Sequence, residues 1–309
     1  MERRLIPINA WIALHRGEAG WPAPLRAQGF RIHRFEAPVA TSLGTVVVDG
    51  ISVRDVEPRV AMATECKSGA NVDVDQAKSY GAMTCTDVAR FVGLPFDHNS
   101  ATLQPLYACL TESRDRVRLG LDKAGLDAPL LVIGDAHVRL EAAAGHQIAA
   151  FNEVIPVGQP PRYVVVDALS DDQEFLEVLL PELMATVSRG DEFVSLDTLL
   201  RAAVPYWDVF GADARKQLRA RARDALVIAF EKNFVNDFRF EATGPKLDRE
   251  VVRVLARPGE FDPRGQTQGW QRLRRQASVA LGRGPSKRPA PGQQTFFEDL
   301  GLGIEIGET

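Results

Sequence analysis

The sequence predicts an α/β (α+β) fold in which a mixed central sheet, flanked by helices, is followed by a mainly helical second domain. Three observations lead to this prediction. Up to about residue 170, strand-like and helix-like patterns follow the order β-β-β-α-α-β, which is typical of a sheet covered by helices. After Ser170 the apolar periodicity is mainly helical. The 309 residues suffice for one large or two modest domains with a sizeable core.

The composition of the sequence limits which classes of function are possible. The net charge of −4 excludes a surface coated with basic residues, so any nucleic-acid-binding surface must be local. No run of 18 apolar residues occurs, so no membrane span is expected. The three cysteines, Cys66, Cys85 and Cys109, lack metal-ligand spacing, so we expect no zinc or iron–sulfur site and a cytoplasmic protein with reduced thiols.

The first domain is predicted to span residues 1–170. A helix near residues 21–28 ends at Gly29, and Asp75 is the expected cap of a helix over residues 76–83. A further helix over residues 111–124 ends at Gly125. Strands are indicated by alternating or β-branched runs, and are expected at residues 30–36, 45–53, 60–67, 129–134, 138–140 and 163–167.

The second domain is predicted to span residues 171–260. Its helices are recognised by amphipathic periodicity, and are expected at residues 175–188, 196–210 and 214–233. Two strands, at residues 238–242 and 250–255, follow them. Three helices followed by a β-hairpin is the order of a winged-helix domain. Residues 261–309 are predicted to form a basic, flexible tail with a short aromatic motif.

Two acidic residues are symmetric about the turn predicted between the second and third strands. Asp49 lies eight residues before Glu57, and Glu65 lies eight residues after it. In an antiparallel hairpin centred there, the two positions fall opposite each other, so their carboxylates lie close together if they share a face. Asp55 is a poorer partner for Glu65 because it lies within the turn.

Lys67 completes a candidate hydrolytic site. Strand alternation places Glu65 and Lys67 on one face of the sheet and the Cys66 side chain on the other. Clustered carboxylates repel each other unless a cation bridges them, and Mg²⁺ or Mn²⁺ prefers such oxygen ligands. A nearby lysine can hold the attacking water or stabilise charge that develops on a phosphate. The pattern therefore points to metal-dependent hydrolysis of a phosphodiester.

These residues resemble the PD-(D/E)XK nuclease superfamily over roughly residues 20–135. The resemblance implies a restriction-endonuclease-like fold and Mg²⁺ (or Mn²⁺) as cofactor. It also implies that Asp49, Glu65 and the backbone carbonyl of Cys66 bind the metal, and that Lys67 is the catalytic lysine.

Gln76 and Tyr80 match the Gln-xxx-Tyr extension of the RecB-like members of this superfamily. In those members the pair orients the DNA strand or the lysine. Glu36 is expected to correspond to an additional upstream glutamate that assists in metal binding. The sequence departs from the family pattern at one point, because Val48 stands where the motif has proline.

Two basic stretches are candidates for DNA contacts. The helix over residues 214–233 carries Arg215, Lys216 and Arg219, and in a winged-helix domain it would enter the major groove. The alternative is a solvated helix face, which nearby acidic residues favour slightly. A second stretch, over residues 264–288, contains no acidic residue. Such a segment either grips phosphates or serves as a solubilising linker. Its candidate contacts are Arg272, Arg274 and Arg275.

A short motif that begins at Gln294 and ends at Phe297 resembles peptides that dock on sliding clamps. The alternative is that Phe296 and Phe297 pack on the surface of their own domain.

Two functions from different classes remain. The sequence predicts a metal-dependent deoxyribonuclease that hydrolyses DNA phosphodiester bonds, with Lys67 positioning water. The alternative is a catalytically inactive, nuclease-like protein with a DNA-binding or regulatory role, whose winged-helix domain supplies its function. The intact set of Asp49, Glu65 and Lys67 favours the enzyme.

Overall fold

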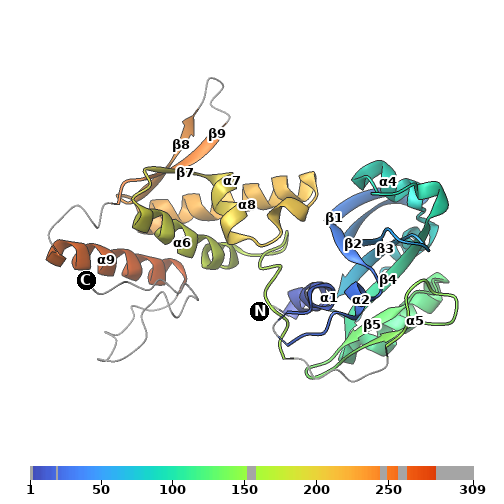
Figure 1. Cartoon of the computed structure of the whole chain (residues 1–309). Coiled ribbons are helices and arrows are strands. Elements are labelled where there is room, and N and C mark those ends of the chain that lie inside the picture. Colours follow the sequence, from blue (N-terminus) through green and yellow to red (C-terminus); the bar gives the residue numbers. More distant parts are fainter. Residues whose placement is uncertain (1–2, 19, 152–157, 244–248, 257–262, 283–309) are drawn as a thin grey trace. The chain divides into compact units, whose positions relative to one another are not determined.

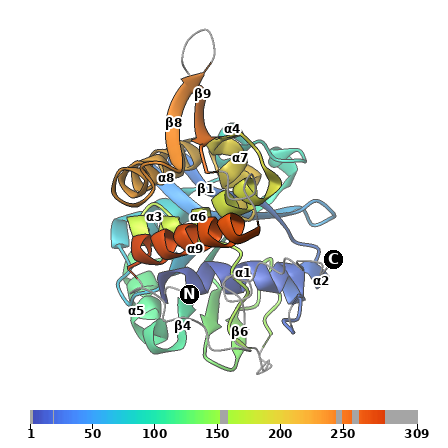
Figure 2. The same ribbon diagram turned by 90° about the vertical axis from the view of Figure 1, so that its left-hand side faces the viewer.

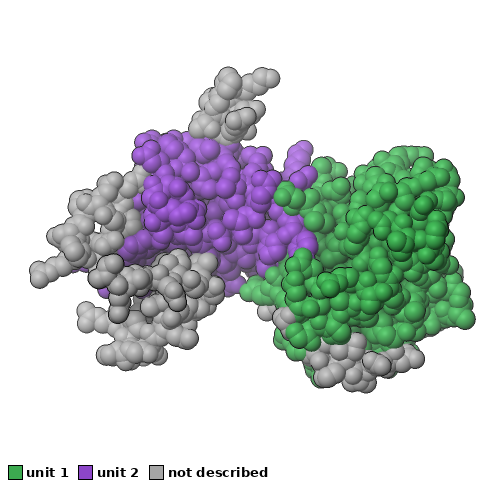
Figure 3. Space-filling view, in the orientation of Figure 1, with its two compact units in different colours: residues 1–164, 208–214 green, residues 165–207, 215–309 purple. Residues whose placement is uncertain are grey.

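A computed structural model of the chain describes residues 3–18, 20–151, 158–243, 249–256 and 263–282 (Figure 1). The chain divides into two compact units, which Figure 3 distinguishes by colour. Unit 1 comprises Met1–Val164 and Asp208–Ala214, and unit 2 comprises Val165–Trp207 and Arg215–Thr309. No helix within the described ranges is long and apolar enough to span a membrane.

Unit 1 is built on a six-stranded mixed sheet with the strand order β1-β2-β3-β4-β5-β6. The first three strands are antiparallel to one another, β3, β4 and β5 run parallel, and β6 returns antiparallel to β5. The mixed sheet flanked by helices that the sequence predicts is therefore confirmed. The strands are β1 (Arg31–Thr41), β2 (Gly44–Arg54), β3 (Val60–Lys67), β4 (Thr102–Leu110), β5 (Leu130–Ile133) and β6 (Val138–Glu141).

Helices cover both faces of this sheet. On one face, α3 and α5 contribute Tyr80 and Val117 to a core that also contains Ile51 of β2. On the other face, α1 lies so close to β2 that a Cβ on Gly50 would come within 2.9 Å of Trp11 Cη2. This close approach explains the glycine at that position. The helices are α1 (Ile6–Arg16), α2 (Pro24–Ala27), α3 (Val74–Ala82), α4 (Cys85–Val92) and α5 (Arg114–Ala124).

Unit 2 combines helices with a small sheet of order β7-β9-β8, in which β9 is antiparallel to both neighbours. Helix α9 lies beside α6 (Figure 2), and Gln173 Nε2 donates to Leu281 O at 3.1 Å. The elements are α6 (Asp172–Arg189), β7 (Phe193–Ser195), α7 (Leu196–Ala203), α8 (Ala212–Asn233), β8 (Phe238–Thr243), β9 (Arg249–Val254) and α9 (Pro263–Ala280).

Three predicted elements are wrong. Residues 163–167 form no strand, because the backbone N–H groups of Tyr163 and Val164 donate to the side chain of Asn9, each at 2.7 Å. The helix predicted over residues 196–210 ends at Ala203. Residues 263–280, expected within a flexible tail, form α9 instead, which buries Leu273 and other apolar side chains at helical spacing.

Strand β4 was not predicted. It contains Pro105, and a proline inside an apolar run normally argues against a strand. The structure tolerates Pro105 because β4 pairs with β5 only from Tyr107 to Leu110, so Pro105 has a strand partner on one side alone. Helix α4 was also missed, although Thr84 and Asp87 form a capping box at its start.

Candidate active site

Asp49 and Glu65 lie at neighbouring positions of β2 and β3, as the symmetry of the turn predicts. The last paired positions of the two strands are Gly50 and Thr64, so the next residue along each strand is Asp49 and Glu65 respectively. The Cys66 N–H donates to Asp49 Oδ2 at 2.6 Å, which fixes the Asp49 carboxylate against β3. The side chains of Asp49 and Glu65 point to the face of the sheet that α3 covers, because they share the strand parity of Ile51 and Ala63 in that core.

A continuous network joins β3 to α3. Lys67 Nζ lies 2.5 Å from Glu65 Oε1 and donates to Gln76 Oε1 at 3.0 Å. The Tyr80 hydroxyl donates to the other carboxylate oxygen, Glu65 Oε2, at 2.7 Å. Glu65 and Tyr80 are buried, whereas Lys67 and Gln76 are half-buried and partly accessible to solvent. The structure therefore brings together the four residues predicted from the Glu-x-Lys and Gln-xxx-Tyr patterns.

Local sequence explains how α3 presents Gln76 and Tyr80 to the sheet. The two residues are four apart, so they lie on one face of the helix, one turn apart. The helix begins after Asp73, whose Oδ1 accepts from the N–H groups of Asp75 and Gln76 at 2.9 and 3.1 Å. The prediction that Asp75 caps this helix is thus wrong by two residues, because Asp73 has the extended backbone and the free carboxylate that capping requires.

The pKa of Asp49 is held well above its ordinary value. Burial is the largest cause, and repulsion from the Glu65 carboxylate adds to it. The hydrogen bond from the Cys66 N–H and the charge of Lys67 act in the opposite direction but do not compensate. Asp49 therefore holds its proton more readily than an exposed aspartate, chiefly because its carboxylate is buried beside that of Glu65.

Glu36 is the third carboxylate near this point. The pairing of Phe35 with Gly50 places Glu36 beside Asp49 on the neighbouring strand, and its charge also raises the pKa of Asp49. Glu36 has a φ of 44°, which is strained for a residue with a side chain. The segment around Gly211 packs against the backbone at Glu36. The Gly211 N–H donates to Phe35 O at 3.0 Å, and a Cβ on Gly211 would lie 2.8 Å from Glu36 O.

Tyr107 is a residue at this site that the sequence did not reveal. It pairs directly with Glu65 across β3 and β4, and its ring centroid lies 5.6 Å from that of Tyr80. Its hydroxyl is buried and has no hydrogen-bond partner within the described part of the chain. Burial and the charges of Glu65 and Asp49 raise its pKa, so the phenol stays protonated at neutral pH. Tyr107 was not predicted because β4 was not predicted, and it is the pairing of β4 with β3 that places Tyr107 beside Glu65.

The donor set fits a hard divalent cation. Mg²⁺ is commonly bound in proteins by one or two carboxylates while it keeps several waters. Asp49 and Glu65 supply two carboxylates, and the charges of Glu36 and Lys67 act on Asp49 from close by. The described ranges contain no group of three or more His, Cys, Asp or Glu side chains that could hold a metal ion. The fit therefore depends on the Asp49 and Glu65 pair together with the backbone carbonyl of Cys66.

The basic residues predicted to contact DNA lie on α8 and α9 of unit 2. Arg219 lies 3.7 Å from Asp197, and Arg272 forms an ion pair with the buried carboxylate of Asp237. Burial lowers the pKa of Arg274. The other residues predicted to contact DNA have exposed or half-buried side chains, namely Arg215, Lys216 and Arg275. The clamp-like motif from Gln294 to Phe297 lies outside the described residues.

A cavity of about 660 Å³ lies elsewhere in unit 1, lined among others by Trp21, Leu110 and Ile133. The cavity is lined by none of the candidate catalytic residues, which are Asp49, Glu65, Lys67, Gln76 and Tyr80. The candidate site is therefore a cluster at the end of β3, separate from this cavity.

Comparison with known proteins gives no independent identification. No family model matches the sequence, no curated protein matches it, and no solved structure matches the fold. The assignment of function therefore rests on the geometry of the site.

Proposed function

We propose that this protein is a metal-dependent deoxyribonuclease of the PD-(D/E)XK type, with unit 1 as a RecB-like nuclease domain. The observation that carries the proposal is the network in which Lys67 contacts both Glu65 and Gln76 while Tyr80 donates to Glu65. A chance Glu-x-Lys on a strand would be solvated, and a chance Gln-xxx-Tyr would have no reason to face it. Here the two patterns, one on β3 and the other on α3, meet at one buried carboxylate.

The residues support a division of roles. Asp49, Glu65 and the carbonyl of Cys66 would hold Mg²⁺ or Mn²⁺, with Glu36 assisting. When bound, such a cation stabilises negative charge on a phosphate and makes a bound water more acidic. Asp49 must be ionised to bind it, so the raised pKa of Asp49 makes metal binding weaken as the pH falls.

Lys67 would orient the attacking water and stabilise charge at the phosphate. Its ammonium group is held at a defined place by Gln76 Oε1 and Glu65 Oε1. Tyr80 holds the second oxygen of the same carboxylate, so Glu65 is kept in one orientation from two sides. Fixed orientation of these groups is what a rate enhancement by positioning requires.

For unit 2 we propose a winged-helix arrangement. The order α6, β7, α7, α8 and the β8–β9 hairpin, with β7 paired to β9, supports this assignment. In such an arrangement α8 would approach DNA through Arg215, Lys216 and Arg219. The free thiols of Cys66, Cys85 and Cys109 are in keeping with a cytoplasmic location.

A second candidate function is that of an inactive, nuclease-like protein that binds DNA. The ion pair between Lys67 and Glu65 favours it, because this pair partly satisfies the charge of Glu65 without a metal. Calorimetric titration with Mn²⁺ separates the two functions. Binding to the wild type that is lost in Asp49→Ala supports the enzyme, and no binding to either protein supports the inactive alternative.

The test of the proposal is cleavage of plasmid and oligonucleotide DNA with Mg²⁺ or with EDTA. The wild type should cleave only with metal, and Lys67→Ala should lower the rate about 100- to 1,000-fold. Lys78→Ala is the matched control, since Lys78 is an exposed lysine on α3 that pairs with Asp75 instead of the site. Equal cleavage by wild type and Lys67→Ala would refute the proposed role of the lysine.

A further inference from the structure

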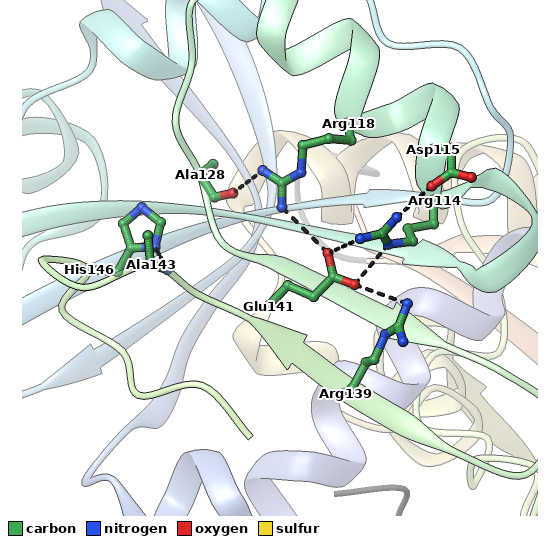
Figure 4. Close-up of polar contacts among 8 residues, drawn as sticks. All are labelled: Arg114, Asp115, Arg118, Ala128, Arg139, Glu141, Ala143 and His146. Carbon is green, nitrogen blue, oxygen red and sulfur yellow. Dashed lines mark hydrogen bonds and ion pairs between the residues drawn. The ribbon is translucent and has the colours of Figure 1, made fainter. Parts of the chain in front are cut away.

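Three arginines gather around Glu141 on unit 1 (Figure 4). Arg114 and Arg118 lie one turn apart on α5, and Arg139 lies on β6. Arg114 Nε and Nη2 donate to the two carboxylate oxygens of Glu141 at 2.8 and 3.0 Å. Arg139 Nη2 lies 3.0 Å from Glu141 Oε1, and Arg118 Nη2 lies 3.8 Å from Oε2. We call these three arginines the arginine cluster.

Arg139 has donors to spare. Its only ionic partner among the described residues is Glu141, and its Nε is buried without a hydrogen-bond partner there. The side chain as a whole is nevertheless 41% exposed, so a ligand can reach the guanidinium group outside its buried Nε. A guanidinium group carries five N–H donors, and Arg139 contacts Glu141 through its Nη2. Arg118 is less available, since its Nη1 donates to Ala128 O at 3.1 Å.

The charge of the cluster suits one phosphodiester. Three guanidinium groups face Glu141 and the exposed carboxylate of Asp115, which contacts Arg114 at 2.5 Å, so one positive charge remains. The hydrogen bond to Glu141 raises the pKa of Arg114, which stays charged. Guanidinium groups match phosphate oxygens in geometry as well as in charge. Because Glu141 already holds the arginines in place, binding would cost little side-chain ordering.

The strand register relates this cluster to the candidate active site. Lys67 pairs with Cys109, Cys109 with Val132, and Val132 with Arg139, so Lys67 and Arg139 lie in one row across four strands. Three strand spacings amount to about 14 Å. One DNA strand advances about 3.4 Å per nucleotide, so the separation of the two backbone positions corresponds to roughly four nucleotides.

A strand cannot follow this row directly. Helix α5 packs over it through Val117 and Leu121, which belong to the same core as Cys109 and Val132. Arg114 is the first residue of α5, so the cluster extends to the amino-terminal end of this helix. A nucleic acid strand that passes around this end of α5 would meet the cluster.

We propose that the arginine cluster, with Arg139 as its principal contact, binds a backbone phosphodiester of a nucleic acid at a distance from the candidate active site. The choice of nucleic acid as ligand rests on the proposed nuclease function. Free inorganic phosphate presents the same chemistry, and the experiment includes it as a competitor.

The test measures binding of fluorescein-labelled 30-nucleotide DNA, single-stranded and duplex, over a range of NaCl concentrations in EDTA, where no cleavage occurs. Arg139→Gln should weaken binding several-fold. It should also reduce the slope of log K against log[NaCl] by about 0.9 for duplex and about 0.7 for single-stranded DNA, the loss of one phosphate contact. Arg139→Lys keeps the charge but loses the planar fork, so it should retain the slope and lose part of the affinity.

The matched control is Arg116→Gln. Arg116 is exposed on α5, and its position between Arg114 and Arg118 turns it to the opposite side of the helix. It should keep both the affinity and the slope of the wild type. Arg118→Gln serves as a second cluster variant if Arg139→Gln fails to fold, with a smaller loss expected. Wild-type affinity and slope in the folded cluster variants would overturn the proposal.

Three further results distinguish free phosphate from nucleic acid as the ligand, and distinguish failure of the phosphate site from failure of the proposed nuclease function. If 10 mM inorganic phosphate binds at the cluster while the cluster variants bind DNA as the wild type does, the site is one for free phosphate and the proposal fails. If the cluster variants lose DNA affinity but the wild type cleaves nothing with Mg²⁺, the phosphate site stands and the proposed nuclease function fails. If the wild type cleaves DNA with Mg²⁺ but Arg139→Gln binds DNA with unchanged affinity, the nuclease function stands and the phosphate site fails.

Discussion

The Tyr80 hydroxyl donates a 2.7 Å hydrogen bond to Glu65 Oε2, and both side chains are buried. This bond links α3 to β3 at the point where Lys67 meets the same carboxylate from the other side. A buried carboxylate needs such partners, because without them its charge carries a large desolvation cost. The contact therefore couples the stability of the fold to the orientation of the candidate catalytic group.

Tyr80→Phe should destabilise the protein by about 1–3 kcal/mol, since it removes a donor from a buried charged acceptor. Tyr107→Phe is the natural comparison, because Tyr107 lies in the same core and its hydroxyl has no partner among the described residues. Loss of this hydroxyl should leave stability unchanged or raise it slightly, because it removes a buried polar group that makes no hydrogen bond within the described ranges. Urea unfolding of both variants provides the measurement. Equal destabilisation by the two substitutions would show that the bond to Glu65 contributes nothing specific.

Asp49→Asn should stabilise the metal-free protein at neutral pH. The folded protein raises the pKa of Asp49, so between the ordinary value near 3.8 and the raised value the folded state holds the proton more tightly than the unfolded state. Stability contributed by this group is present below the ordinary pKa and is lost as the pH rises through the folded pKa. Asparagine cannot ionise, so the variant should not lose this stability as the pH rises.

The measurement for Asp49→Asn is the Tm in EDTA from pH 4 to pH 8. The difference between variant and wild type should be small at pH 4 and should grow with pH, and a change of about 1 kcal/mol moves Tm by roughly 2–4 °C. Saturating Mg²⁺ should reduce or reverse the difference, because only the wild type keeps both carboxylate ligands. A pH-independent difference would contradict the raised pKa.

Gln76→Ala should lower kcat about 10- to 100-fold and leave KM nearly unchanged, because Gln76 acts by holding the ammonium of Lys67 in position. Gln76→Glu keeps an acceptor at that place and should recover part of the rate. Steady-state cleavage of a short oligonucleotide separates the two constants. A rise in KM at constant kcat would indicate that Gln76 contacts the substrate instead of the lysine.

Gly50→Ala should destabilise unit 1 by about 1–3 kcal/mol through overpacking, since the added methyl would lie 2.9 Å from the Trp11 ring. Gly69→Ala serves as the control, because no atom lies within 4 Å of the Cβ position of this exposed glycine. Thermal unfolding compares the two. A neutral Gly50→Ala would mean that α1 moves freely away from β2.

The sequence was sufficient for those parts of the site that depend on local rules. The partnership of Asp49 with Glu65 follows from turn symmetry, and the common face of Glu65 and Lys67 follows from strand alternation. Both are consequences of one hairpin, which the apolar pattern and the turn residues specify. The helical spacing of Gln76 and Tyr80 is equally local.

What the sequence did not show depends on contacts between distant segments. Tyr107 joins the site through β4, which Pro105 concealed. Gly211 reaches Glu36 from far along the chain, and no periodicity relates the two. The arginine cluster forms because β6 returns beside α5, so the spacing of Arg114, Arg118 and Arg139 in the sequence gives no sign of their meeting around Glu141.

The most direct test of the central claim is a crystal structure of the protein soaked in Mn²⁺, with the ion located by its anomalous scattering. The account predicts a peak bound by the carboxylates of Asp49 and Glu65 and the carbonyl of Cys66, at about 2.0–2.3 Å from each oxygen. Crystals of Asp49→Ala should lack the peak. Full Mn²⁺ saturation without density between Asp49 and Glu65 would contradict the assignment of a metal-dependent nuclease.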